Sequence, residues 1–324
     1  MSAMWRRKIQ EQGRVTLSIS LPKEWVRECA LQKSDELVLY KDIHKNLIVR
    51  PVNESEVVKK TILLPKNVET LRSEILSFYL HGVHEIEFSS KERIDTNVRS
   101  SIKSIISSLI GFEIMDDSSN QILVKDMLDY SHISIEDLIQ RIVKIVLSMY
   151  QDTYEAIENN DVGSAKGIIE RDREVNNLYL LTIKCIRCVI AFRTLQDRSM
   201  DYLDYMDHLL VARDLERIGD CIKDICLFIS KEKMNLGDPL LSTLKSIFLD
   251  ILKILKESLD VFFKKDMNSA SQLIDSHGTT KKTLRDLSKS IFKDEKVPET
   301  IDIIYNLSRI LEYAIDITEM VRQE

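Results

Sequence analysis

Glycine and proline are scarce in this sequence, with 8 Gly and 5 Pro among 324 residues. Average chains carry roughly three times that share. This scarcity argues against β-sandwiches with many tight turns and against long disordered linkers. Phosphate-binding loops built on glycine are excluded as well, since the sequence contains no Gly-x-x-x-x-Gly-Lys run. The composition instead predicts long helices with few breaks.

Long apolar runs and a regular set of cysteines are also lacking. No stretch approaches the ~18 consecutive apolar residues of a membrane-spanning helix, and the first residues contain no apolar export signal. Five Cys, an odd number, do not form a disulfide framework. Cys185 and Cys188 lie among aliphatic residues of a predicted helix, which favours packing over zinc binding. We therefore expect a cytoplasmic protein without membrane insertion.

The first 52 residues have the alternating pattern of β-strands, at 15–20, 36–40 and 46–50. Pro22 begins a short helix that is expected to run from Lys23 to about Ala30. Ten basic and six acidic side chains give the segment a net charge of +4, which leaves −10 for the rest of a chain whose total is −6. A small, basic, β-rich domain is therefore predicted at residues 1–52.

The remainder of the chain divides by its hydrophobic pattern. Residues 57–127 combine short strands with two amphipathic helices and predict a small α+β linker domain. The rest is helical, with breaks that leave six helices of roughly 25–35 residues. The expected fold class is mainly α: tandem three-helix bundles at 133–232 and 238–324, preceded by the β-rich domain and the α+β domain.

The two predicted bundles look like copies of each other. Asp161-Val162-Gly163-Ser164-Ala165 is followed 105 residues later by Asp266-Met267-Asn268-Ser269-Ala270. Arg213-x-Leu215-Glu216-x-x-x-Asp220 is followed 96 residues later by Arg309-x-Leu311-Glu312-x-x-x-Asp316. Both matches keep their order and their place on the helices, which indicates an internal duplication.

Each copy carries a pair of carboxylates four residues apart, Glu216 with Asp220 and Glu312 with Asp316. Residues at this spacing lie side by side on a helix, with about 5–6 Å between their Cβ atoms. A hard cation bound by both would turn their repulsion into attraction. Ile218 marks the core side of the first helix, so the pair is expected on the outer surface of its bundle. A solvated acidic face without metal is the alternative.

The second helix of each copy is expected to add metal ligands. Asp172 and Asn176 lie in the first copy, and Asp275 and His277 lie in the second, where His277 is equivalent to Asp172. Imidazole is a ligand for transition metals, so the exchange is tolerable. The predicted cofactor is a metal ion, either iron or another divalent or trivalent cation. A histidine on an ordinary polar surface is the alternative at residue 277.

The run Val211-Ala212-Arg213-Asp214-Leu215-Glu216-Arg217-Ile218-Gly219-Asp220, preceded by Arg171-Asp172-Arg173-Glu174-Val175-Asn176, resembles the signature of the PhoU family of phosphate regulators. The resemblance covers about residues 133–324 and is weaker in the second copy, which lacks the Arg-Ile-Gly of the motif. It implies tandem three-helix bundles. Some members of that family bind metals in surface clusters through acidic helix pairs.

Residues 1–52 resemble a different family, the swapped-hairpin domains of AbrB/SpoVT type. The resemblance rests on Gly13-Arg14-Val15, on Ser20-Leu21-Pro22-Lys23-Glu24-Trp25 and on Leu31-x-Lys33-Ser34-Asp35-Glu36-Leu37. It implies a homodimer with interleaved strands that places basic residues on DNA, and the two resemblances together are typical of archaeal regulators. The candidate DNA-binding residues are Arg6, Arg7, Lys8, Arg14 and Lys23. Extra cations that merely keep a dimerisation domain soluble are the alternative.

These observations predict a regulator of phosphate uptake and homeostasis. In the first hypothesis it is a DNA-binding transcriptional regulator, whose bundles bind metal and contact phosphate-transport or signalling proteins. An adaptor without DNA binding is the second hypothesis, and a metal-storage protein is the third. We expect no enzyme, because no nucleophile stands beside a base and no histidine follows a Glu by three residues as in di-iron carboxylate enzymes.

Overall fold

The structure, a computed structural model, describes residues 4–13, 15–41, 45–52, 57–192, 200–231, 238–294 and 298–321. Its contacts divide the chain into two units, Met1–Glu56 and Val57–Glu324. This division falls four residues after residue 52, where the sequence predicts the end of the basic N-terminal domain. The finer domain bounds that the sequence suggests inside the second unit stay predictions.

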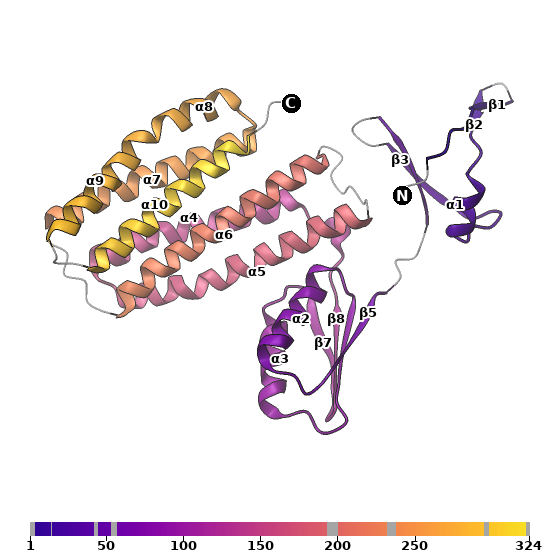
Figure 1. The fold of residues 1–324 in the computed structure, drawn as a ribbon, viewed down its shortest axis with the longest axis horizontal. Helices are drawn as coiled ribbons and strands as arrows, with labels where there is room; N and C mark the ends of the chain where they lie inside the picture. The colour runs from indigo at the N-terminus through magenta and orange to yellow at the C-terminus, as the bar shows by residue number, and fades with distance from the viewer. Residues whose placement is uncertain are drawn as a thin grey trace. The chain divides into compact units, whose positions relative to one another are not determined.

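The first unit consists of two separate hairpins and a short helix (Figure 1). Strands β1 (Gln10–Gln12) and β2 (Thr16–Ser18) pair antiparallel, as do β3 (Leu37–Lys41) and β4 (Leu47–Pro51), and α1 (Lys23–Glu28) lies between the hairpins in sequence. The short helix and the strands at 16–18, 37–41 and 47–51 agree with the sequence pattern. Strand β1 was missed, because a wholly polar Gln-Glu-Gln segment carries no alternation.

Of the residues between 4 and 52 whose exposure the structure describes, none is buried. Large apolar side chains lie open instead, among them Val15 at 90%, Leu17 at 67% and Leu47 at 63% exposure. A two-stranded hairpin alone is at best marginally stable in water. The described part of this unit therefore has no hydrophobic core of its own.

The second unit begins with an α+β layer built from β5 (Lys59–Leu63), α2 (Val68–Leu80), β6 (Glu85–Ser89), α3 (Thr96–Ser107), β7 (Phe112–Asp117) and β8 (Gln121–Asp126). The strand order is β5-β6-β8-β7, with β5 parallel to β6 and the other pairs antiparallel. Alternate residues such as Ile86 and Phe88 are buried with residues of both helices. On the face of the sheet opposite the helices, the Glu85 carboxylate forms ion pairs with Lys59 at 2.8 Å and with Lys125 at 3.0 Å.

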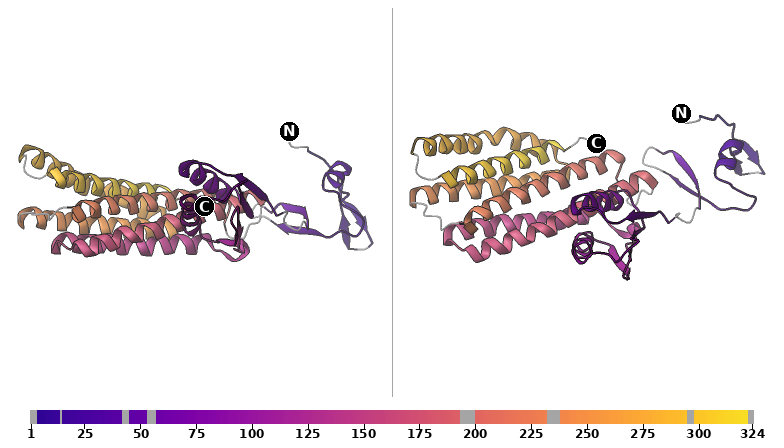
Figure 2. Two further views of the ribbon diagram at one scale, coloured as in Figure 1. Left: turned by 90° about the horizontal axis from the view of Figure 1, so that it is seen from below. Right: turned by 60° about the horizontal axis from the view of Figure 1, so that its bottom comes forward.

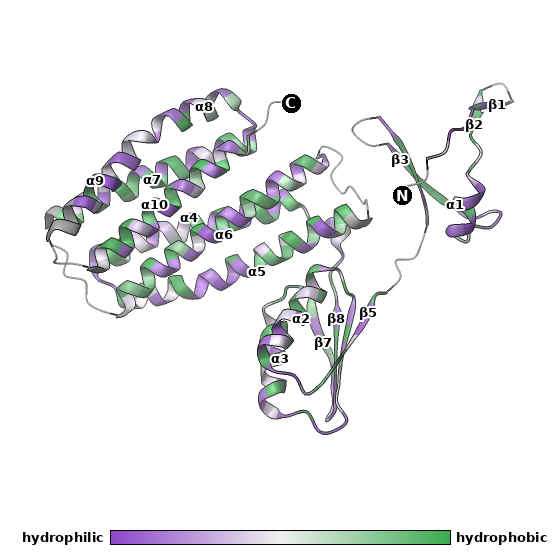
Figure 3. Ribbon diagram, in the orientation of Figure 1, coloured by the Kyte–Doolittle hydropathy of each residue, from purple (hydrophilic) through white to green (hydrophobic). Residues whose placement is uncertain are grey.

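The helical part contains α4 (Ile135–Asn159), α5 (Val162–Phe192), α6 (Tyr202–Lys231), α7 (Asp238–Lys264), α8 (Met267–Ser276), α9 (Gly278–Asp294) and α10 (Pro298–Glu319). These helices run side by side in every view (Figures 1 and 2). Apolar and polar residues alternate along them (Figure 3), and their buried side chains form one continuous cluster from Ile135 to Val321. Within the described ranges, no helix is both long and apolar enough to cross a membrane.

The mainly α fold class is confirmed, with one difference in the second copy. The sequence pattern has breaks near residues 265–268 and 294–298 and predicts one helix between them, but α8 ends at Ser276 and α9 begins at Gly278. Glycine and the β-branched Thr279 and Thr280 that follow have low helix propensity, which accounts for the break at His277.

The predicted duplication is visible in the turns before α5 and α8. Asn160 and Lys265 both adopt left-handed backbone conformations, with φ of 51° and 53°. In the next position, Asp161 accepts hydrogen bonds from two backbone N–H groups and from the Ser164 hydroxyl at 2.7 Å, and Asp266 does the same with the Ser269 hydroxyl at 2.6 Å. In both halves a residue with a left-handed backbone thus ends one helix, and the Asp that follows it caps the next.

A buried ion pair joins the α+β layer to α5. The Lys184 ammonium lies 2.5 Å from Asp126 Oδ2, and their side chains are 0% and 3% exposed. Tyr130 donates a hydrogen bond to the same carboxylate at 2.6 Å. The ammonium also lies 4.1 Å from the ring centre of Tyr79 and 4.5 Å from that of Phe112. Burial lowers the pKa of Lys184, and Asp126 opposes that change.

Lys184→Met is expected to destabilise the second unit by about 3–5 kcal/mol, because it leaves the Asp126 carboxylate buried without its cation. Urea unfolding followed by circular dichroism measures the loss. Adding Asp126→Asn should recover most of it, since neither charge then remains. The exposed control Lys253→Met should change stability by less than about 0.5 kcal/mol. A loss below about 1 kcal/mol for Lys184→Met would contradict the assigned role of this pair.

Candidate functional site

The candidate site lies where α5 packs along α6 in the first copy. A Cβ atom added at Gly219 would lie 3.4 Å from Val175 Cγ1 and 3.5 Å from Asp172 Oδ1, which is ordinary van der Waals contact, so α5 and α6 are closely packed here. This approach places Asp172 of α5 beside Glu216 and Asp220 of α6. We call these three carboxylates, with Asn176 and Lys223, the first notch.

A basic side chain occupies the centre of the first notch. Lys223 Nζ donates to Asp172 Oδ2 at 3.0 Å and also to Asp220 Oδ1. The Asn176 amide donates to Asp172 Oδ2 at 3.1 Å. Asp172 Oδ1 is buried and has no hydrogen-bond partner. Three carboxylates thus face one ammonium, and the balance of charge in the notch is negative.

Burial and charge alter the proton affinity of these groups. Burial raises the pKa of Asp172, and Lys223 opposes that change. The pKa of Glu216 is also raised, first by burial and then by repulsion from Asp220 and Asp172. For Lys223, burial acts to lower the pKa, but the hydrogen bonds to Asp220 and Asp172 outweigh it and leave the pKa raised.

The expectation that Glu216 and Asp220 lie on the outer surface holds only in part, because both are partly covered. Asp172 is 4% exposed, and Glu216 is only partly exposed, because α5 covers the side of α6 opposite Ile218. Asp220 is the most open of the three, with 45% of its side chain exposed. Lys223 was not singled out from the sequence, although its spacing of three residues from Asp220 already placed it on the same face of the helix.

In the second copy the predicted residues do not converge in the same way. Asp275 and Glu312 are exposed, and Glu312 pairs loosely with Lys281 at 3.9 Å. His277 is 3% exposed, lies at the break between α8 and α9, and has a buried Nε2 without a hydrogen bond. Its backbone is helical, and it stands eleven residues after Asp266 as Asp172 does after Asp161, so the equivalence of the two positions stays a prediction. Asp316 lies near Asp214 of α6, whose pKa is raised first by burial and then by repulsion from Asp316.

Oxygen donors such as those of the first notch suit hard cations. Across the described ranges, however, no group of three or more His, Cys, Asp or Glu side chains is arranged to hold a metal. In the first notch Lys223 stands between Asp172 and Asp220, so the residues as arranged do not fit a metal ion. The metal set inferred from the sequence stays a prediction in both copies.

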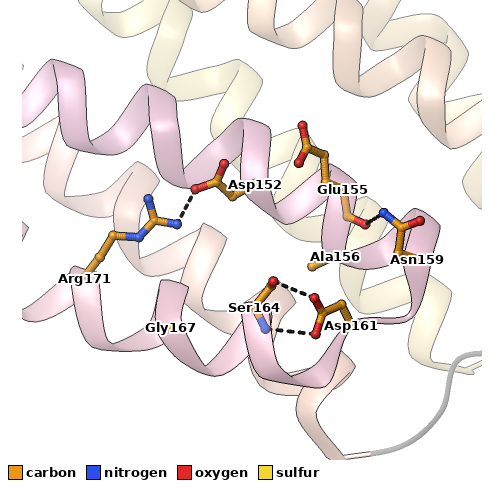
Figure 4. A pocket seen from close by; sticks show the side chains of 8 residues that line it. All are labelled: Asp152, Glu155, Ala156, Asn159, Asp161, Ser164, Gly167 and Arg171. Atoms are coloured by element: carbon orange, nitrogen blue, oxygen red, sulfur yellow. Dashed lines mark hydrogen bonds and ion pairs between the residues drawn. The ribbon is translucent and has the colours of Figure 1, made fainter.

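A polar pocket of 380 Å³ lies beside the turn between α4 and α5 (Figure 4). Its polar side chains are largely engaged with one another: Arg171 pairs with Asp152 at 2.5 Å, and Asp161 caps α5 through Ser164. Ala165, which follows Ser164, is fully buried in the core. The side chains that line the pocket therefore hold the turn between α4 and α5 in place and do not form a set of reactive groups.

The DNA-binding candidates belong to the first unit. Arg6, Arg7, Lys8 and Lys23 are exposed, as contact with phosphate requires. Arg14 lies outside the described residues. The structure thus leaves these cations accessible and does not test their contact with DNA.

Comparison with known proteins points to one class for the helical region. The PhoU domain family matches residues 139–229, which extend from α4 to the last turns of α6 and include the first notch. A solved structure of the phosphate transport system regulatory protein PhoU from Streptococcus pneumoniae has the same fold, with a TM-score of 0.51, 21% identity, and coverage of 58% of this chain and 91% of that one. These matches support a PhoU-type helical domain.

Two curated relatives carry a more specific description. The phosphate-specific transport system accessory protein PhoU of Escherichia coli K12 is 29% identical over 141 residues, which are 43% of this chain and 57% of that protein. The protein of the same description from Serratia marcescens is 31% identical over 131 residues, or 40% of this chain and 52% of that protein. The chain therefore matches about half the length of these relatives.

A pH prediction follows from Asp214, which is 1% exposed and has a buried oxygen without a hydrogen bond. Burial raises its pKa above the ordinary 3.8, with Arg213 opposing. A carboxyl whose pKa is raised by folding stabilises the fold below the ordinary value, and that contribution is lost as pH rises through the folded-state pKa. At neutral pH the buried carboxylate is therefore unfavourable.

Asp214→Asn is accordingly expected to raise the melting temperature at pH 7 by about 2–4 °C, the shift that about 1 kcal/mol produces in a domain of this size. The gain should shrink as the pH approaches 4. Melting curves of the variant and of the exposed control Asp286→Asn between pH 4 and 7 measure the difference. An equal gain at every pH, or a loss at pH 7, would contradict the stated cause.

Proposed function

We propose that this chain is an accessory regulator of phosphate transport that acts by binding partners and not by catalysis. The observation that carries the proposal is the PhoU domain match at residues 139–229, together with relatives described as accessory proteins of phosphate-specific transport. The helical part would provide the surface for a transport or signalling protein. Its excess of acidic residues suits a basic partner surface.

We further propose that the first unit forms a homodimer and contacts DNA. Its open apolar side chains and the absence of burial among its described residues from 4 to 52 support dimerisation, since a second copy would provide the missing interior. The net charge of +4 on residues 1–52 supports contact with phosphates, and pairing two copies doubles that charge. On this view the protein couples phosphate transport to transcription.

The dimer is tested by light scattering after gel filtration. The full chain, of 37.6 kDa, should elute with the mass of two copies. Leu17→Glu, which places a charge on the open apolar surface of β2, should shift the mass toward one copy. The control Leu249→Glu, at a 54% exposed position of α7, should leave the mass unchanged. A single-copy mass for the unaltered chain would refute dimerisation.

DNA binding is tested by gel shifts with the chain's own upstream DNA at several salt concentrations. Replacing Arg6, Arg7 and Lys8 by Ala should weaken binding and reduce the slope of log affinity against log salt by about 1 for each phosphate that is no longer neutralised. The matched control replaces Lys253, Lys256 and Lys264 of α7. No binding at low salt would favour the adaptor without DNA activity, because the accessory role of the helices does not depend on DNA.

A further inference from the structure

The two edges of the α+β sheet differ in how they are protected from pairing with another strand. The strand order is β5-β6-β8-β7, so β5 and β7 form the edges (Figure 1). Along β7 the register with β8 shifts between Ile114 and Asp116, and Glu113 and Asp116 are exposed. An irregular register and exposed charges keep an edge strand from pairing with another chain. The β7 edge is therefore protected.

The β5 edge is regular instead. Its register with β6 is unbroken over Lys59–Leu63, and among the described strands β5 pairs with β6 alone. The charge of Lys59 is already paired with Glu85 at 2.8 Å, which leaves Lys60 as the one lysine of the strand that no described carboxylate neutralises. Leu63, at the other end of the strand, is 69% exposed.

The backbone of β5 has hydrogen-bonding groups on its outer side. The Val58 carbonyl and the Leu64 N–H form hydrogen bonds toward β6, at 2.9 Å each. Because the N–H and C=O groups of alternate residues point to the same side of a strand, those of Lys59, Thr61 and Leu63 point away from β6. A row of such groups is a template for another strand.

We propose that this edge pairs with the β5 strand of a second copy, antiparallel and with Thr61 opposite Thr61, so that two four-stranded sheets become one. This register places Lys59 opposite Leu63 of the second copy and Lys60 opposite Ile62 of the second copy. No lysine therefore stands directly opposite a lysine, which would be unfavourable, whereas a pair of threonines across two strands is favourable.

A second copy is the occupant because the chain itself holds two β5 strands near each other once the first unit dimerises. The inference thus rests on the proposed dimer. Residues 52–58 separate β4 from β5, so the start of β5 stays within roughly 30 Å of the end of β4. Tethers of this length give effective concentrations in the millimolar range, at which a weak contact between two edges is sufficient.

The test is oxidative cross-linking of the full chain with copper phenanthroline, followed by a non-reducing denaturing gel. Residues that face each other in a hydrogen-bonded antiparallel pair have Cα atoms about 5.5 Å apart, which is within the range of a disulfide. Thr61→Cys should therefore give a band of two linked copies as the main product. Met115→Cys, at a 51% exposed position of β7, is the matched control and should give no more of this band than the unaltered chain.

The register is tested with Lys59→Cys and Leu63→Cys. In the proposed pairing each change alone leaves the two new thiols about 14 Å apart along the strands, so neither should link the copies. The two changes together place one thiol opposite the other and should link as efficiently as Thr61→Cys. Adding Thr61→Pro removes an outward N–H that an edge strand does not need in a single copy, and it should abolish that link. Melting curves establish that each variant is folded.

A two-copy mass in light scattering without a link through Thr61→Cys would overturn the edge pairing and leave the dimer of the first unit intact. A link through Leu63→Cys alone, or equal linking through Met115→Cys, would also overturn it, because neither position meets itself in the proposed register. A single-copy mass would refute both the edge pairing and the dimer. The proposed accessory role of the helices does not depend on any of these outcomes.

Discussion

The close packing of α5 against α6 is the constraint on which the rest of the first copy depends. The two helices are closely packed at Gly219, and Asp172 is thereby brought from a helix surface into a nearly closed environment. A buried carboxylate needs a partner, and α6 supplies Lys223 from the position one turn beyond Asp220. The charge arrangement of the notch thus follows from helix packing rather than from a loop built around a ligand.

A second charged contact depends on α5 in the same way. The side chain of Lys184 extends from α5 into the α+β layer, where its ammonium contacts the Asp126 carboxylate and the Tyr79 ring. One helix therefore carries a buried carboxylate toward α6 and a buried ammonium toward the sheet. Since each charge is useful only with its partner in place, both neighbours must keep their register along α5. The helix ties two layers of the second unit together through specific pairs as well as through apolar packing.

Most of the helical architecture could be predicted from the sequence, because it depends on local signals. Asp161 and Asp266 mark the starts of their helices, scarce glycine predicts long helices, and alternating residues such as Ile86 and Phe88 predict buried strand faces. The break at His277 could not be placed from the 3.6-residue pattern, which continues across it. The order of the strands also needed the structure, since pairing between distant segments leaves little trace in local periodicity.

The residues of the candidate site could be named from the sequence, but their burial could not be predicted from it. Spacing alone placed Glu216 beside Asp220, whereas the exposure of that face depended on whether a neighbouring helix covers it.

The turns at Asn160 and Lys265 have the same geometry in the two halves. These turns set the angle between successive helices through backbone conformation and a single Asp cap, and they do not depend on the side chains of the outer helix surfaces. Because both halves share the same turn, their outer side chains are free to diverge while the helix arrangement is kept. A duplicated protein can therefore come to bind a different partner on each half.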